Sequence, residues 1–462
     1  MRSNRNARYP YHLAKLVAGR LQKLDFDPPP PQILLRFFET LYFASLHTDE
    51  GRHCLCNVSF VEQFGVQEPV ADPPPNHWKI FRFEQTLPFD VATLTKLSEA
   101  ADPNVSSLAV CCDNSGGLVI WGMVDQERRY SDFVALDSDE RLCRPGLFQA
   151  AIAGVGNISV SKDYDLLGSL EQDALIDAYH NVLWTGPVHA LLSDSFRCAF
   201  AKVNASDKRI AEATPFEDEM FIRWENAICR MLLNIQQYRH GGGLLLVPRW
   251  PADDMHVKHQ LTYDRLPQAL LGMVRHQMLR RRTGESIAQY CSQDAHTMPC
   301  DLHTDAIENR QLRDEYKTEV LGCVRFIASL SRIDGFVAMD RGLVARGFGV
   351  EARADSELSE IFIAGDALGT PKLLKPAALS QFGTRHRAMM RYCDKHDGAL
   401  GFVVSQDGDI RATMKVDGRL ILWENINLHL QIQSEQAGAV TTMSFPDSRT
   451  GPGDSGRVRY AG

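Results

Sequence analysis

Apolar residues recur every three or four positions in two stretches near the start of the chain, residues 11–24 and 33–46. This spacing places them on one face of a helix, so both stretches predict amphipathic helices that pack on a core. The proline run Pro28–Pro31 ends the first of these helices. The pattern over residues 165–184 also predicts a helix.

Shorter apolar runs predict strands between these helices. One such run is residues 54–60, and residues 107–112 and 118–123 flank the turn sequence Asp113–Gly117, which predicts a hairpin. Residues 154–159, Gly-Val-Gly-Asn-Ile-Ser, have two glycines of a phosphate-binding loop but lack its third glycine and a following helix. The sequence therefore favours a turn between two strands at this point.

The second half of the chain alternates long helical patterns with short buried strands. Thr214–Glu217 has the residues of a capping box and opens an amphipathic helix. Gly241–Gly243 ends this helix and leads into an apolar strand, residues 244–247. Further helices are predicted at residues 304–330 and 388–395, and further strands at residues 336–339, 343–347, 402–404, 410–415 and 419–422.

This alternation predicts an α/β fold with a mixed, twisted sheet flanked by helices over residues 214–430. A separate α+β domain is expected before it, over residues 1–205, with a polar linker between the two. Residues 251–303 are interpreted as an insertion in the second domain. The Gly-, Pro-, Ser- and Arg-rich residues 444–462 predict a disordered tail.

The composition of the 462 residues, 44% hydrophobic and 23% charged, is that of an ordinary globular protein. A net charge of −8 disfavours bulk nucleic-acid binding, which needs a basic surface. No apolar run is long enough for a membrane span, and no secretory signal follows the basic first residues. The 11 cysteines have neither a disulfide framework nor zinc-ribbon spacing, which predicts reduced thiols in the cytoplasm.

Candidate chemistry gathers in residues 383–387, Gly-Thr-Arg-His-Arg. Guanidinium forks suit phosphate oxygens, and a helix start here would also present the Thr384 hydroxyl and backbone N–H groups to an anion. An extended turn or a plain basic surface turn is the alternative. Upstream, Asp334 precedes an apolar strand, where a carboxylate can bind Mg²⁺ or Mn²⁺. Downstream, an apolar strand runs into the polar turn Ser405–Gly408.

In this order, the three motifs resemble the diadenylate cyclase family, whose domain was first known from the DNA-integrity scanning protein. That family has Asp-Gly-Ala, then Gly-Thr-Arg-His-Arg, then a strand ending in Val-Ser-Glu-Glu-Thr-Gly. Here the motifs are Asp334-Gly335-Phe336, Gly383-Thr384-Arg385-His386-Arg387 and Val404-Ser405-Gln406-Asp407-Gly408. The resemblance covers about residues 214–425. The preceding region is similar to the sensor region found before the cyclase domain in some bacterial proteins.

The resemblance implies an enzyme that condenses two ATP molecules into cyclic di-AMP and releases two pyrophosphates. It implies that Asp334 and Asp407 bind the divalent metal, Mg²⁺ or Mn²⁺, and that Asp334 helps to deprotonate a ribose 3′-hydroxyl. Because one domain holds one ATP, it also implies a homo-oligomer with domains face to face. The remaining catalytic and nucleotide-binding roles are implied for Gly335, Phe336, Gly383, Thr384, Arg385, His386, Arg387, Ser405 and Gln406.

The motifs depart from the family at two positions, because Phe336 replaces an alanine and Gln406 replaces a glutamate. The spacing from Asp334 to Arg385 is also longer than the family implies. Two other classes of function therefore stay open: a catalytically degenerate, ATP-binding sensor and a protein-interaction module. The sequence does not identify the ligand or partner of the N-terminal domain.

Residues 251–303 contain further polar groups with suggestive spacings. His256 and His259 could bind a metal, as could a set formed by His296, Cys300 and His303, but each set lacks a further ligand. Arg280–Arg282 are more typical of a solvated helix face than of a phosphate contact.

Overall fold

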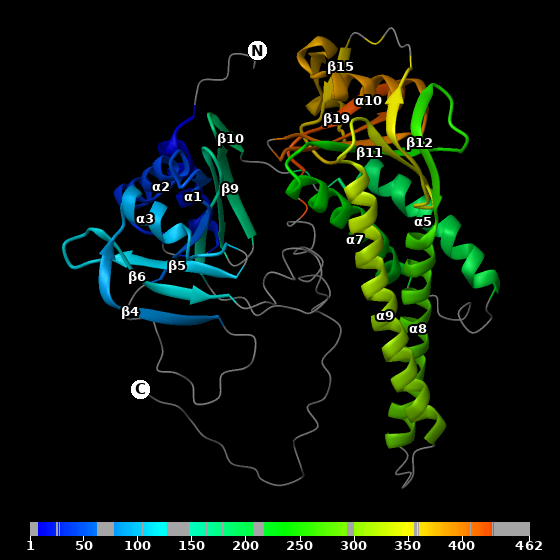
Figure 1. Ribbon diagram of the computed structural model, residues 1–462, viewed down its shortest axis with the longest axis horizontal. Coiled ribbons are helices and arrows are strands. Elements are labelled where there is room, and N and C mark those ends of the chain that lie inside the picture. Colours follow the sequence, from blue (N-terminus) through cyan, green and yellow to red (C-terminus); the bar gives the residue numbers. More distant parts are fainter. Residues whose placement is uncertain are drawn as a thin grey trace.

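The described residues form two large sheets, which have separate hydrophobic cores, and one small two-stranded sheet (Figure 1). This confirms the α/β class with mixed sheets. The computed structural model describes residues 8–24, 26, 28–61, 78–103, 105–126, 147–162, 165–176, 180, 182–206, 217–292, 300–354, 358, 360–406, 408–426 and 428. The predicted tail at residues 444–462 lies outside these ranges.

The N-terminal unit packs three helices on one face of an eight-stranded sheet (Figure 1). These are α1 (Pro10–Lys23), α2 (Pro31–Ser45) and α3 (Val91–Ser98). As predicted, the apolar faces of α1 and α2 are buried in one core. The strands lie in the order β10-β9-β8-β7-β3-β5-β6-β4, with bounds β3 (Cys56–Phe60), β4 (Lys79–Pro88), β5 (Ser106–Cys112), β6 (Leu118–Asp125), β7 (Phe148–Gly154), β8 (Asn157–Lys162), β9 (Asp165–Glu171) and β10 (Ala174–Ile176); β1 (Thr48–Asp49) and β2 (Arg52–His53) pair separately.

Two predictions in this unit are confirmed and one is wrong. β5 and β6 form the predicted antiparallel hairpin, and the glycine pair at residues 154–156 is a turn between β7 and β8. The helix predicted from residue 165 is instead the antiparallel pair β9 and β10. Short apolar runs do not distinguish a helix from a strand by their period, and here pairing with β8 decides the conformation.

The C-terminal unit is built on a nine-stranded sheet in which β11 is parallel to β13 and antiparallel to β17. As predicted, β13 and β14 form a hairpin. The strands lie in the order β12-β14-β13-β11-β17-β18-β19-β15-β16, with bounds β11 (Gly242–Val247), β12 (Met255–Tyr263), β13 (Phe336–Asp340), β14 (Ala345–Ala352), β15 (Glu360–Ile363), β16 (Lys375–Ala378), β17 (Leu400–Val404), β18 (Ile410–Val416) and β19 (Arg419–Trp423).

Helices cover both faces of this sheet because its central strands are apolar on both sides. In β11, Leu244 and Leu246 face one core, whereas Leu245 and Val247 face another. The first core is shared with α5 (Pro187–Ser206), α7 (Glu217–Gln237), α8 (Arg265–Ser292) and α9 (Cys300–Leu330), and the second with α10 (Thr384–Lys395).

The residues interpreted as an insertion form β12, α8 and the start of α9. α8 and α9 run side by side and extend well beyond the sheet (Figure 1). Their close approach uses Gly272, where a Cβ atom would lie 2.5 Å from the Tyr316 ring. At their sheet end, Arg265 donates two hydrogen bonds to Glu319, at 2.8 and 3.1 Å.

The core of the C-terminal unit begins earlier than the expected boundary between residues 205 and 214. Val188, Leu192 and Phe196 of α5 are buried in the same core as Trp224 of α7. This packing assigns α5 to the second unit, because its apolar face has its partners there. The predicted linker overlaps the end of α5. Residues 207–216 lie outside the described ranges.

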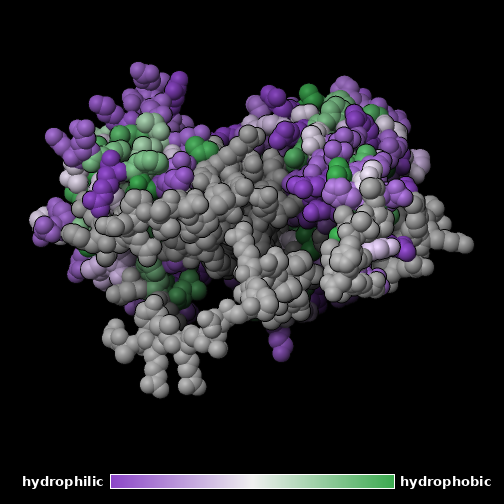
Figure 2. Space-filling model, turned by 90° about the horizontal axis from the view of Figure 1, so that it is seen from below, coloured by the Kyte–Doolittle hydropathy of each residue, from purple (hydrophilic) through white to green (hydrophobic). Residues whose placement is uncertain are grey.

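The coloured surface in Figure 2 mixes hydrophilic and hydrophobic residues over both units. Among the helices that the structure describes, none combines the length and the apolar character needed to cross a membrane.

Candidate functional site

The three sequence motifs meet at one edge of the nine-stranded sheet. β11 and β13 begin at this edge because they are parallel, and β17 ends there because Val404 pairs with Gly242, the first residue of β11. Asp334 precedes β13, and the polar turn from Ser405 follows β17. α10 begins at the same edge with the basic motif.

A contact between Arg385 and Asp334 joins the first two motifs. Arg385 Nη2 lies 3.6 Å from Asp334 Oδ1, and the Asp334 side chain is 98% exposed. A Cβ atom on Gly241 would lie 2.9 Å from Arg385 Nη1 and 3.3 Å from the backbone nitrogen of Gln406. Gly241 also has a φ of +65°, so this position favours glycine and lets Arg385 lie close to the backbone.

The basic motif forms the first turn of α10, which resolves the alternatives left by the sequence in favour of a helix start. Gly383 is the N-cap residue, and the first backbone hydrogen bond of the helix runs from Arg387 N to Gly383 O at 3.0 Å. Glycine provides no side-chain cap, so the backbone N–H groups before that of Arg387 remain available to an anion. Arg387 Nη2 also donates to the Thr384 hydroxyl at 3.4 Å.

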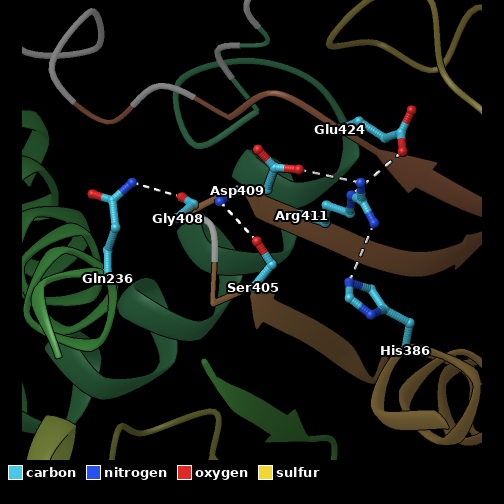
Figure 3. Close-up of polar contacts among 7 residues, drawn as sticks. All are labelled: Gln236, His386, Ser405, Gly408, Asp409, Arg411 and Glu424. Atoms are coloured by element: carbon cyan, nitrogen blue, oxygen red, sulfur yellow. Dashed lines mark hydrogen bonds and ion pairs between the residues drawn. The ribbon is translucent and has the colours of Figure 1, made fainter. Parts of the chain in front are cut away.

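His386 is partly buried, as are Arg385 and Arg387, and its ring faces β18 (Figure 3). Arg411 Nη1 lies 3.4 Å from His386 Nε2. Burial, together with the charges of Arg411 and Arg385, lowers the pKa of His386 to about 4. The imidazole is therefore neutral near neutral pH.

Arg411 is a residue of the site that sequence reasoning missed. Its guanidinium lies 3.3 Å from Asp409 Oδ2 and 3.4 Å from Glu424 Oε1 (Figure 3). The available signal was strand alternation, because Arg411 lies between Ile410 and Ala412 and must face away from their core. Its partners on α10 and after β19 could not be found in this way.

Ser405 supports the turn between β17 and β18. Its hydroxyl accepts a hydrogen bond from Asp409 N at 3.0 Å, and Gln236 Nε2 donates to Gly408 O at 2.7 Å (Figure 3). Gln406 is exposed at this edge. Asp407, an expected metal ligand, lies outside the described residues.

Gly335 and Phe336 are packed against neighbouring strands of the sheet. A Cβ atom on Gly335 would lie 2.6 Å from the backbone carbon of Gly349 in β14. Phe336 is 3% exposed and belongs to the core beneath α10, where its ring lies against Gly243. Phe336 therefore fills the core rather than an open nucleotide pocket.

Asp334 is a described residue of the site that could hold a metal ion. Over the described residues, no group of three or more His, Cys, Asp or Glu side chains is placed to hold a metal ion. Asp334 nevertheless offers an exposed carboxylate next to the first turn of α10. Mg²⁺ commonly uses one or two carboxylates together with phosphate oxygens and water.

The alternative metal sites gain no further ligand from the described part of the chain. His256 and His259 lie on β12, where residues three apart point to opposite faces, and His259 stacks on Phe348 at 4.7 Å. His296 lies outside the described residues. The Arg280–Arg282 run lies on α8, where Arg281 is 3.6 Å from Glu285, as expected of a helix face.

Comparison with known proteins gives one match. Residues 25–125 match the family described as "Probable sensor domain DACNV". The match spans α2 to β6, within the N-terminal unit. This confirms the expected sensor region in the N-terminal part of the chain. Neither the curated proteins nor the solved structures contain a match to the chain.

Proposed function

We propose that the chain is a diadenylate cyclase whose activity is regulated by the N-terminal sensor region. The observation that carries the proposal is the contact of Arg385 with Asp334, 3.6 Å apart. It brings an exposed carboxylate to the uncapped, arginine-rich first turn of a helix. A carboxylate beside an anion site is the minimum that a nucleotidyl transfer needs.

The residues of the site divide the chemistry between them. The first turn of α10, with Thr384, Arg385 and Arg387, binds the triphosphate and stabilises the negative charge of the departing pyrophosphate. A divalent metal, Mg²⁺ or Mn²⁺, held by Asp334 and Asp407 would neutralise phosphate charge. Asp334 also accepts the proton of the attacking 3′-hydroxyl.

In each half-reaction a ribose 3′-oxygen forms a bond to the α-phosphorus of the other ATP, and the bond to pyrophosphate breaks. Two such steps convert two ATP into cyclic di-AMP and two pyrophosphates. One domain binds one ATP, so two protomers must present their sites to each other, and two-fold symmetry is the simplest arrangement.

Incubation of the purified full-length protein with ATP and Mg²⁺ or Mn²⁺, followed by mass spectrometry, tests this proposal. Cyclic di-AMP should form, and Asp334→Asn should abolish it while the melting temperature stays unchanged, because the side chain is 98% exposed. Asp397→Asn is the matched control, since Asp397 is 84% exposed and also ion-paired. Equal turnover in the wild type and Asp334→Asn would contradict the assigned role of Asp334.

A second candidate is an ATP-binding sensor without turnover, and the exposed Gln406 at the site edge favours it, because the resembled motif has an acid there. Gln406→Glu is therefore the informative change and should raise a slow wild-type turnover. ATP binding without product in both proteins would establish the second candidate. Phe336→Ala is unsuitable as a companion change, because truncation of a buried phenylalanine to alanine destabilises a protein by about 3–5 kcal/mol.

A further inference from the structure

The contact between Arg411 and His386 determines which nitrogen of the imidazole carries the proton. A guanidinium group has only hydrogen-bond donors, so Nε2 of His386 must be the acceptor at 3.4 Å. A neutral imidazole with an accepting Nε2 carries its proton on Nδ1. Over the described residues, the contact with Arg411 is the hydrogen bond of the His386 ring, so Nδ1–H can donate to a ligand.

Arg411 is itself held in place from two sides. Asp409, just before β18, and Glu424, after the end of β19, place their carboxylates 3.3 and 3.4 Å from the guanidinium. All three side chains are mostly buried, at 23%, 27% and 19% exposure. Ion pairs confined in this way hold one geometry better than exposed pairs do.

We propose that Arg411 is a positioning residue that fixes His386 as the neutral Nδ1–H tautomer, so that Nδ1–H donates to a phosphate oxygen of the bound nucleotide. The nucleotide part of this inference rests on the proposed function. The tautomer itself does not, because it follows from the contact in the ligand-free protein.

The charged groups that act on His386 are Arg385 on its own helix, Arg411 on β18 and Asp409 just before β18. The two arginines disfavour the imidazolium and Asp409 favours it, while burial acts in the same direction as the arginines. A low pKa alone would therefore not identify Arg411 as the cause. The tautomer does identify Arg411, because burial by itself does not favour a proton on one ring nitrogen over the other.

Long-range ¹H–¹⁵N NMR of the ¹⁵N-labelled full-length protein reports the tautomer of each histidine. His386→Gln identifies the relevant signals among the 15 histidines. In the wild type, Nδ1 should be protonated and Nε2 unprotonated from pH 5.5 to 8. A protonated Nε2 in the wild type would overturn the proposal without any arginine variant, so it stays testable even if a variant does not fold.

Arg411→Met should shift the tautomer mixture towards Nε2–H and raise the pKa of His386. Arg346→Met is the matched control, because Arg346 is 26% exposed and is ion-paired to Asp340 in the same sheet, at 2.7 Å. An unchanged tautomer in Arg411→Met, or an equal change in Arg346→Met, would overturn the role of Arg411.

Addition of ATP with Mg²⁺ separates this inference from the proposed function. The wild-type Nδ1 resonance should shift on binding, and Arg411→Met should weaken ATP binding by about tenfold, as expected for one misplaced hydrogen bond. If the ligand-free tautomer is as proposed but ATP causes no shift, the positioning contact holds and the nucleotide role of His386 is wrong. If ATP does not bind at all, the proposed function fails instead.

Discussion

Arg385 joins two parts of the chain that are far apart in the sequence. Its guanidinium reaches Asp334 in front of β13 and lies over Gly241 in front of β11. It is also only 31% exposed, so it is held rather than free to move through solvent. A partly buried arginine at a helix start is well placed to bind an anion, because little side-chain entropy remains to be lost.

Arg385→Ala and Arg387→Ala should each weaken ATP binding by roughly ten- to a hundredfold, since a hydrogen bond to a charged group contributes about 1.5–3 kcal/mol. Titration calorimetry with ATP measures the effect. Arg391→Ala is the matched control, because Arg391 is an exposed arginine further along α10 and should leave the affinity unchanged. Unchanged affinity in both motif variants would remove the nucleotide site from this helix.

At the scale of the elements, the packing of α5 on α7 buries a carboxyl group. Glu225 is fully buried, and its Oε1 lies 3.0 Å from Nδ1 of His189, which also contacts the carbonyl of Leu183 at 2.7 Å. Among the described residues, none forms a hydrogen bond with its other oxygen, Oε2. Burial raises the pKa of Glu225 to about 7, although the contact with His189 acts in the opposite direction.

This burial predicts a pH-dependent stability. Between the ordinary pKa of about 4.5 and the folded value of about 7, the folded protein binds a proton that the unfolded chain releases. Stability should therefore fall as the pH rises through this window, by about 3 kcal/mol in all. Urea unfolding from pH 4.5 to 8 measures the slope.

Glu225→Gln should flatten that slope, because the amide cannot ionise and still offers an acceptor to His189. The exposed Glu315→Gln is the control and should keep the wild-type slope. A slope that is equally steep in Glu225→Gln would assign the pH dependence to other groups.

The hairpin of β13 and β14 predicts a second stability effect. Gly335 has a φ of +120°, and its Cβ position lies 2.8 Å from the backbone nitrogen of Val350. Gly335→Ala should lower the urea midpoint, with at least the roughly 1–3 kcal/mol cost of a strained backbone. Gly284→Ala on α8 is the control: nothing lies within 4 Å of that site, and the change should stabilise by about 0.5–1 kcal/mol. A neutral Gly335→Ala would show that β14 can move away.

At the scale of the whole molecule, one chain offers one copy of the candidate site, whereas the proposed product joins two nucleotides. Specific activity should therefore rise with protein concentration until the paired form saturates. Activity assays from nanomolar to micromolar protein, with light scattering at the same concentrations, measure this. A constant specific activity from a protein that remains monomeric would contradict the face-to-face scheme.

Much of the architecture could be predicted because it depends on local patterns. The apolar stripes of α2 and α9 and the hairpins β5–β6 and β13–β14 follow from hydrophobic period and turn chemistry. Asp334, Thr384, Arg385 and Arg387 could be named for the same reason, since a motif is a local feature.

What the sequence could not determine depends on partners that are distant along the chain. Pairing with β8 makes β9 a strand, and burial against α7 assigns α5 to the second unit. Phe336 occupies a position of a site motif but lies in the core. Arg411 matched no motif but contacts His386, because β18 and α10 pack face to face only in the folded sheet. The sequence alone therefore determined the local elements and the motif chemistry, and the tertiary structure decided which side chains meet, because side-chain contacts depend on packing between elements rather than on position along the chain.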